Sequence, residues 1–138
     1  MSEIISFFNA LFDRFNKENG LSDVTYAMCK ASDRFSHFFL SFMFPDEEIK
    51  GDGRWEREYQ SQIIVNGKGS RIDFFYEENG DKYVIENKLF DQNAHEEYLE
   101  AFPDSEGYKR AFIANYEYNG EQYCHCATWK AFLTKLKE

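Results

Sequence analysis

One stretch of the sequence decides the fold: Arg71-Ile72-Asp73-Phe74-Phe75-Tyr76-Glu77-Glu78-Asn79-Gly80-Asp81-Lys82-Tyr83-Val84-Ile85-Glu86-Asn87-Lys88. Its two arms are rich in β-branched and aromatic residues, and the Asn-Gly pair between them is the strongest short-range signal for a β-hairpin. With Asn79 and Gly80 as the two loop residues, the register places Asp73 opposite Glu86. Because side chains alternate between the two faces of a strand, Asp73, Glu86 and Lys88 are predicted to share one face.

The other face of this hairpin is predicted to build the hydrophobic core. Its side chains are apolar almost throughout: Ile72, Phe74, Tyr76, Tyr83 and Ile85. The sequence therefore predicts a hairpin with one core face and one charged face.

The two carboxylates on the charged face indicate a metal site. Directly opposed strand residues have Cβ atoms about 4.5–5.5 Å apart, so Asp73 and Glu86 would repel each other. A divalent cation removes that cost, and hard oxygen ligands suit Mg²⁺ or Mn²⁺. Lys88 lies on the same face, where it could orient an attacking water. The alternative is an ordinary solvated face with a chance Asp, Glu and Lys, although the apolar residues before Glu86 favour a buried strand.

Two short segments resemble the signature of the PD-(D/E)XK nuclease superfamily, in which an Asp ends one strand and Glu-x-Lys follows on the next. They are Arg71-Ile72-Asp73 and Ile85-Glu86-Asn87-Lys88, with Ile72 where the family name has proline. The layout is similar over most of the chain and looks like a variant found in small bacterial nuclease-like proteins. The resemblance implies an α/β (α+β) fold with a restriction-endonuclease-like αβββαβ core, which is a mixed central sheet flanked by helices.

The resemblance also implies metal-dependent hydrolysis of phosphodiester bonds in nucleic acid. Asp73, Glu86 and the Asn87 carbonyl would hold Mg²⁺ or Mn²⁺, and Lys88 would help to position hydroxide for in-line attack. Related proteins add an acidic residue near the metal and polar residues from the helix after the Lys. The candidates for these supporting roles are Glu18 or Glu58, Gln60, Gln92, His95 and Tyr98.

Two more Asn-Gly pairs predict further turns. A two-residue loop at Asn66-Gly67 would set Gln60 opposite Asp73 and place Glu58 on the charged face, unless Gly69 carries a bulge that changes this register. A loop at Asn119-Gly120 would join residues 111–118 to 121–127 as a later hairpin.

Helical spacing of apolar residues surrounds these strands. The first predicted helix runs through Phe15 and stops before Asn19-Gly20. The others are one capped by Ser22 that runs to Lys30, one capped by Ser32 that ends at Pro45, one over residues 93–102 ended by Pro103, and one that starts near Thr128. Because a strand that follows a crossover helix generally packs parallel in the same sheet, this order predicts a mixed sheet.

Length and composition indicate one packed domain over residues 1–138, since 43% of the residues are hydrophobic and 19% aromatic. No apolar run is long enough to cross a membrane, and the N-terminus shows no secretion signal.

Three cysteines, an odd number, favour reduced thiols and a cytoplasmic location. Cys124-His125-Cys126 lacks a fourth zinc ligand at suitable spacing.

The net charge of −9 argues against strong electrostatic binding to nucleic acid. We therefore expect weak or partner-assisted binding, with DNA favoured over RNA, and a homodimer or protein partner as an added source of affinity. The alternative function is a weakly active or inactive binding or regulatory module, for example in a phage-defence or toxin system.

Overall fold

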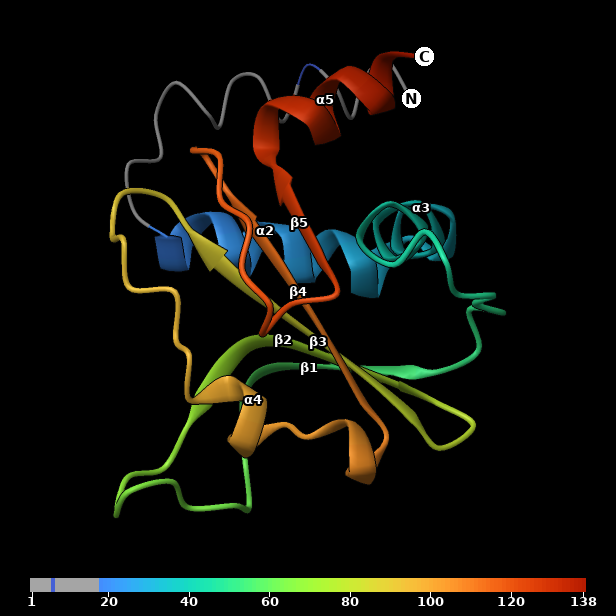
Figure 1. Ribbon diagram of the computed structural model, residues 1–138. Coiled ribbons are helices and arrows are strands. Elements are labelled where there is room, and N and C mark those ends of the chain that lie inside the picture. Colours follow the sequence, from blue (N-terminus) through green and yellow to red (C-terminus); the bar gives the residue numbers. More distant parts are fainter. Residues whose placement is uncertain (1–5, 7–17) are drawn as a thin grey trace.

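The computed structural model describes Ser6 and residues 18–138, in which five strands form one sheet in the order β1-β2-β3-β4-β5 (Figure 1). The strands β1, β2 and β3 are antiparallel, whereas β4 runs parallel to β3 and β5 runs parallel to β4. The sheet is therefore mixed, as the sequence predicted. The strand bounds are β1 Arg54–Gln60, β2 Arg71–Glu78, β3 Asp81–Lys88, β4 Tyr108–Ala114 and β5 His125–Thr128.

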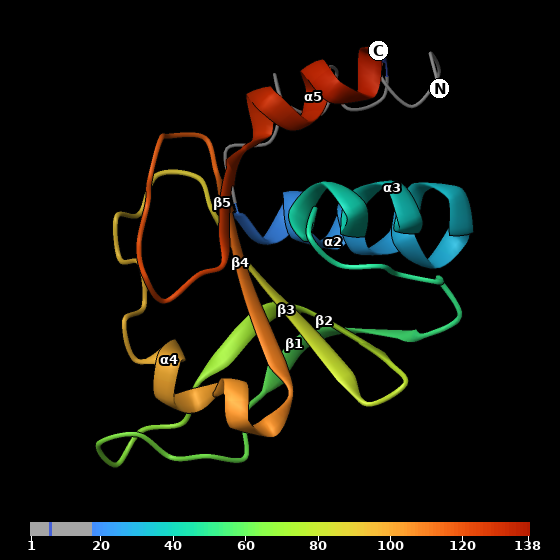
Figure 2. The same ribbon diagram turned by 45° about the vertical axis from the view of Figure 1, so that its right-hand side comes forward.

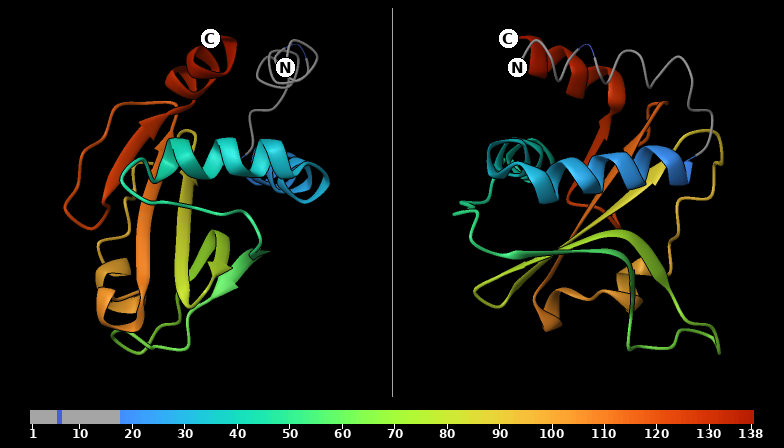
Figure 3. Two further views of the ribbon diagram at one scale, coloured as in Figure 1. Left: turned by 90° about the vertical axis from the view of Figure 1, so that its right-hand side faces the viewer. Right: turned by 180° about the vertical axis from the view of Figure 1, so that it is seen from behind.

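Helices lie on both sides of this sheet, so the α+β prediction is confirmed (Figures 1 and 2). Three helices share a hydrophobic cluster with one face: α2 Glu18–Ala31, α3 Asp33–Met43 and α5 Trp129–Lys137. The short helix α4 Tyr98–Ala101 packs on the other face and is followed by the 3₁₀ helix η1 Asp104–Glu106. The two views of Figure 3 show the sheet between these layers.

Helix α3 forms as its sequence predicts. Its first turn is capped by Ser32, whose Oγ accepts a hydrogen bond from the Phe35 N–H at 3.1 Å. Phe35, Phe39 and Met43 are buried on one side of the helix, and the helix ends at Met43, before Pro45. The Phe-rich stripe is therefore part of the core.

The register of the β2–β3 hairpin is also as predicted. Phe74 pairs with Ile85 and Tyr76 pairs with Tyr83. Asn79 and Gly80 both have positive φ, at 50° and 84°, as a tight two-residue hairpin turn requires. The regular ladder ends at the Phe74 pair, one step before Asp73 and Glu86.

The predicted register between the first two strands is wrong by two residues. Val65 and Lys68 exchange backbone hydrogen bonds around the Asn66-Gly67 turn, but residues 62–64 then oppose Gly69 alone. This bulge shifts β1 along β2, so Gln60 pairs with Arg71 instead of facing Asp73.

The later hairpin at Asn119-Gly120 does not form, because β4 and β5 are parallel neighbours joined by a long loop, residues 115–124. The predicted helix over residues 93–102 is also wrong in length, since only Tyr98–Ala101 is α-helical there. In both cases the local sequence favoured one structure, a turn or a longer helix, and the packing of these segments against the sheet imposed another.

Helix α2 begins at Glu18 and passes through Asn19-Gly20, where the sequence predicted an interruption. Ser22 lies inside this helix and is buried, so it does not cap a separate helix. The first predicted helix, through Phe15, lies outside the described residues.

Both faces of the sheet carry a hydrophobic core, so the expectation of one core face and one charged face is wrong. Phe74 and Ile85 face the cluster under α2, α3 and α5, whereas Phe75 and Val84 face a second cluster under α4. Ile72 belongs to this second cluster and not to the first. Burial on both faces is typical of strands with parallel neighbours, and the buried Glu86 and Lys88 lie at the carboxyl end of β3.

Among the described residues, no helix is long and apolar enough to cross a bilayer.

Candidate metal site at the carboxyl end of β3

Asp73 and Glu86 lie at this end of the sheet, with their carboxyl groups close enough for the Glu86 charge to act on Asp73. Both side chains are largely buried, with 19% and 6% of their surface exposed. Burial and the neighbouring Glu86 charge raise the pKa of Asp73 well above its usual value, against the lowering effects of the Asn87 N–H and of Arg57. Two neighbouring buried carboxyl groups form a site that takes up either a proton or a cation.

The two oxygens of Glu86 have different surroundings. Oε2 lies 3.2 Å from His95 Nε2 and 3.7 Å from Lys88 Nζ. Oε1 is buried and has no hydrogen-bond partner among the described residues. Since a buried polar atom without a partner costs about 1–3 kcal/mol, a divalent cation at this oxygen fits the residues present.

Asn87 ties the site to the helical layer behind it. Its N–H donates to Asp73 Oδ2 at 2.7 Å. Its side chain points to the opposite face, where Nδ2 donates to Ser22 Oγ at 3.0 Å and Oδ1 accepts from Trp129 Nε1 at 2.8 Å. Because the N–H and C=O of one strand residue point to the same side, the Asn87 carbonyl also faces β2 and Asp73.

Lys88 is held beside Glu86. Only 9% of its side chain is exposed, and its Nζ lies 3.1 Å from Asp91 Oδ2 as well as 3.7 Å from Glu86. The Asn93 N–H and the Lys88 ammonium lower the pKa of Asp91, so this carboxylate stays charged. The lysine is thus fixed by two carboxylates at the place that the sequence predicted.

His95 and Tyr98 also reach the site. His95 Nε2 lies against Glu86, its Nδ1 is 2.8 Å from Glu97 Oε1, and its ring stacks on Tyr98 at 4.5 Å between centroids. Burial lowers the pKa of His95, but the hydrogen bonds to Glu86 and Glu97 outweigh it and raise the pKa overall. The Tyr98 hydroxyl donates to the Arg71 carbonyl at 2.7 Å.

Of the other four supporting candidates, Gln60, Glu58 and Gln92 do not join this cluster. The side-chain amide of Gln60 donates to the Ser70 carbonyl at 3.1 Å. Glu58 lies across from Asp73 in the shifted register, but it is exposed and has a φ of 55°, outside the regular ladder. Glu18 is the first residue of α2, and its side chain is outside the described part of the chain. Gln92 is exposed on the segment after β3.

Arg57 is the main residue that the sequence prediction missed. Its Nη1 donates to the Asp73 carbonyl at 2.9 Å and lies 3.6 Å from Asp73 Oδ1, while its Nε pairs with Asp23 Oδ1 at 3.0 Å. Its Nη2 is buried without a hydrogen-bond partner among the described residues. The only sequence signal for this contact was the bulge considered at Gly69.

No three His, Cys, Asp or Glu side chains within the described part of the chain surround one point as a metal cage. The candidate site is therefore a pair of carboxylates with a nearby backbone carbonyl. Such sites suit Mg²⁺, which keeps several waters and is completed by substrate phosphate.

Comparisons with known proteins add no functional assignment. No protein-family model matches the chain, and no curated protein matches it. Among solved structures, it is similar to the crystal structure of a protein of unknown function, AF1548, with 14% sequence identity and a TM-score of 0.41. That similarity covers 77% of this chain and 67% of the other. The interpretation of the site therefore depends on the geometry of this chain alone.

Proposed function

We propose that this chain is a Mg²⁺- or Mn²⁺-dependent phosphodiesterase that cuts nucleic acid, with the restriction-endonuclease-like αβββαβ core of the PD-(D/E)XK superfamily. The observation that carries the proposal is the pair of largely buried carboxyl groups of Asp73 and Glu86, with Glu86 Oε1 buried without a hydrogen-bond partner among the described residues. Lys88 lies beside them and is held by Asp91. Two neighbouring carboxylates repel each other, so their burial at the end of two inner strands is a cost that a bound cation removes.

Each residue has a definite task in this proposal. Asp73, Glu86 and the Asn87 carbonyl would hold the metal, which when bound polarises the phosphodiester and activates water. Lys88, fixed by Asp91, orients the attacking water and offsets charge that develops on the phosphate. The side chain of Asn87 anchors this end of β3 to α2 and α5, so the ligands keep their positions.

The proposed substrate is nucleic acid, with DNA favoured over RNA, in a cytoplasmic setting. Because the net charge is −9, the affinity of the isolated chain is expected to be low, and a second copy or a protein partner would supply the rest.

The test is cleavage of plasmid and single-stranded DNA in Mg²⁺ by Glu86→Gln and Lys88→Ala. Both variants should lose cleavage by about a hundredfold or more, as expected when one charged group acts in the transition state. Glu86→Gln keeps the shape of the side chain and an oxygen that can accept from His95, so circular dichroism should show that the variant is folded.

Glu56→Gln is the matched control, since this β1 carboxylate is 48% exposed and pairs only with exposed Arg54 among the described residues. It should cut as the wild type does. Equal cleavage by the wild type, Glu86→Gln and Lys88→Ala would reject the proposal.

The second candidate is a binding or regulatory module that keeps the fold without turnover. It is favoured by the cations that already face the two carboxylates, namely Arg57 at Asp73 and Lys88 and His95 at Glu86. Calorimetric titration with Mn²⁺ separates the two: absence of binding near millimolar concentration, together with absence of cleavage, would favour the module.

A further inference from the structure

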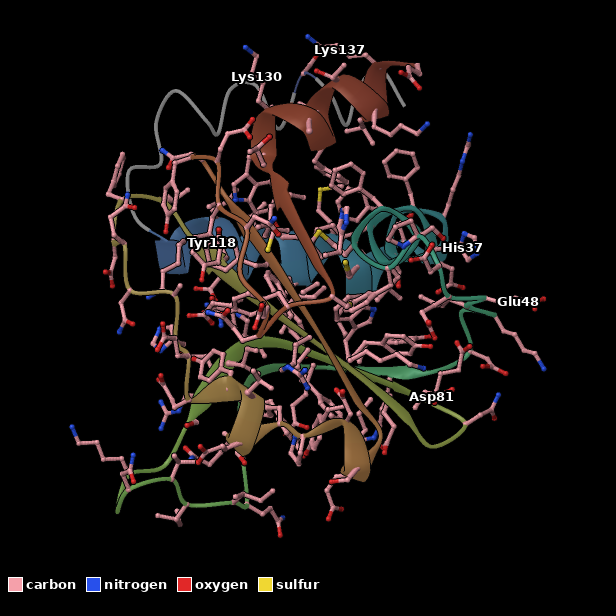
Figure 4. The ribbon with its side chains drawn as sticks, in the orientation of Figure 1. His37, Glu48, Asp81, Tyr118, Lys130 and Lys137 are labelled. Atoms are coloured by element: carbon pink, nitrogen blue, oxygen red, sulfur yellow. The ribbon has the colours of Figure 1, made fainter. Side chains whose placement is uncertain are left out.

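The segment between β3 and α4, residues 89–97, is held against the candidate metal site by the loop between β4 and β5. Gln122 Nε2 and the Tyr123 hydroxyl both donate to the Ala94 carbonyl, at 3.0 and 2.7 Å. Tyr118, labelled in Figure 4, accepts a hydrogen bond from the same Gln122 amide at 2.8 Å. These contacts fix the backbone immediately before His95.

His95 itself is held in a conformation that few residues adopt. Its φ is 55°, in the left-handed region, and its N–H donates to Asn93 Oδ1 at 3.1 Å. Backbone strain of this kind costs about 1–3 kcal/mol and persists where the surroundings fix it, often at functional sites.

The orientation of the His95 ring is set from two sides. Glu97 Oε1 lies 2.8 Å from Nδ1, and the ring lies flat on Tyr98, with 5° between the ring planes. A carboxylate that binds one ring nitrogen of a histidine fixes the orientation of the ring and makes the other nitrogen a stronger partner for a ligand. Nε2 is thereby directed at Glu86 Oε2, 3.2 Å away.

From this geometry we infer that His95 is a phosphate-contacting residue, which donates from Nε2 to an oxygen of the phosphodiester lying on the metal at Glu86. The inference rests on the proposed function. The imidazole faces two carboxylates, which only accept hydrogen bonds, so Nε2 presents a proton toward the site. The Nε2 donor that faces Glu86 Oε2 would then serve a phosphate oxygen held beside that carboxylate.

Glu97 is a positioning residue: it contacts His95, and it acts on the phosphate only through that histidine. Its carboxylate holds Nδ1, and 42% of its side chain is exposed, so its replacement leaves the core intact. The pair gives the candidate site a donor to phosphate on the side opposite Arg57, in a molecule whose overall charge repels phosphate.

The experiment measures binding of a short single-stranded DNA oligonucleotide in Ca²⁺, a cation used here to bind the site without turnover, and binding of Mn²⁺ alone by calorimetry. His95→Ala should weaken oligonucleotide binding about tenfold, as for loss of a charge-assisted hydrogen bond. Its Mn²⁺ affinity should stay within about twofold of the wild type or rise, since a neighbouring donor has left Glu86.

Three further variants sharpen the result. His95→Gln keeps an N–H donor and should recover part of the oligonucleotide affinity, while Glu97→Gln should show an intermediate loss. His37→Ala is the matched control, because His37 contacts the Ile49 carbonyl from α3, away from the site (Figure 4). It should bind both probes as the wild type does.

The possible failures are distinct. Unchanged oligonucleotide binding by His95→Ala overturns the inference, and if Glu86→Gln still loses Mn²⁺ binding the proposed function stands. A loss of Mn²⁺ affinity in His95→Ala as large as that in Glu86→Gln also overturns it, because His95 would then serve the metal. If the wild type binds no Mn²⁺, the inference and the proposed function fall together.

Discussion

Arg57 reaches Asp73 only because β1 is displaced along β2 by a bulge. The two-residue turn at Asn79-Gly80 sets a register that holds as far as Phe74 and Ile85, one step short of Asp73 and Glu86, so the proximity of the two acids could be predicted from the sequence. The contact of Arg57 depends instead on three residues opposing Gly69 alone, and no residue preference specifies that number. The local sequence therefore predicted the two acids and Lys88 but not Arg57 beside Asp73.

Glu78 illustrates a buried carboxylate whose role is structural. Its two oxygens accept hydrogen bonds from the Lys50 N–H at 2.8 Å, the Gly51 N–H at 2.7 Å and the Tyr76 hydroxyl at 2.7 Å. Burial raises its pKa, but these three donors outweigh it and lower the pKa overall. The carboxylate thus fastens the loop before β1 to the end of β2.

We predict that Glu78→Gln lowers the free energy of unfolding by about 1.5–3 kcal/mol at neutral pH, the usual range for hydrogen bonds to a charged group. Since the pKa is lower in the folded protein, the stabilisation is present above the unfolded value of about 4.3. It is lost as the pH falls through the folded value. Urea denaturation of the wild type and the variant should therefore differ at pH 7 and converge in acid.

The control for this prediction is Glu77→Gln. Glu77 is the neighbouring carboxylate, 30% exposed and paired with exposed Arg54 at 3.1 Å. Its replacement should change stability by less than about 0.5 kcal/mol. A larger loss for Glu77→Gln than for Glu78→Gln would contradict the role given to the buried carboxylate.

At the scale of secondary-structure elements, the four Asn-Gly pairs of the sequence lie in four different structural settings. Asn79-Gly80 closes a regular hairpin, and Asn66-Gly67 closes a turn whose strands are then shifted. Asn19-Gly20 lies inside α2, and Asn119-Gly120 joins two parallel strands. The dipeptide is identical in each case, so the surrounding ladder or helix decides whether its turn preference is realised.

The segment between β3 and β4 shows the same competition between local sequence preference and the surrounding structure. Apolar spacing predicted a helix over residues 93–102, but the left-handed His95 and the hydrogen bonds at Ala94 hold most of this segment in irregular backbone. Only Tyr98–Ala101 is α-helical. The mixed sheet could be predicted because a strand that follows a crossover connection generally returns parallel in the same sheet. The path of the crossover segment depends instead on a residue 28 positions further along the chain.

A prediction at this scale concerns the hairpin turn. Gly80 has a φ of 84°, and no atom lies within 4 Å of where its Cβ would stand, so Gly80→Ala introduces backbone strain without a clash. We expect a loss of about 1–2 kcal/mol in the free energy of unfolding, because L-residues other than Gly disfavour this region. Chemical denaturation measures it.

Gly80→Asn is the companion variant, since Asn tolerates the left-handed conformation through local hydrogen bonds. It should lose clearly less stability than Gly80→Ala. If the two variants were equally destabilised, side-chain bulk and not backbone conformation would be responsible.

Over the whole molecule, charge is arranged differently at the two ends of the sheet. The carboxyl end of β3 carries the candidate site with Arg57, Lys88 and His95. At the other end, near the hairpin tip marked by Asp81 in Figure 4, lies a cavity of about 580 Å³. Five acidic residues and two basic residues line it: Asp46, Glu47, Asp81, Asp104 and Glu121, with Lys109 and Arg110. Because acidic residues outnumber basic ones around this cavity, we expect a phosphate backbone to approach from the carboxyl end of β3 instead.

This arrangement predicts an unusual salt dependence of nucleic acid binding. Each phosphate neutralised on a single strand contributes a slope of about −0.7 to the plot of log affinity against log salt concentration. With only Lys88 and His95 proposed at the phosphate and a net charge of −9 behind them, the slope should be shallower than about −1.5. Oligonucleotide affinity measured in constant Ca²⁺ over a series of KCl concentrations gives this slope. An uncharged methylphosphonate oligonucleotide is the control and should show almost no dependence on salt. A slope near −4 would require about six phosphate contacts, and would reveal a basic surface that the described residues do not form.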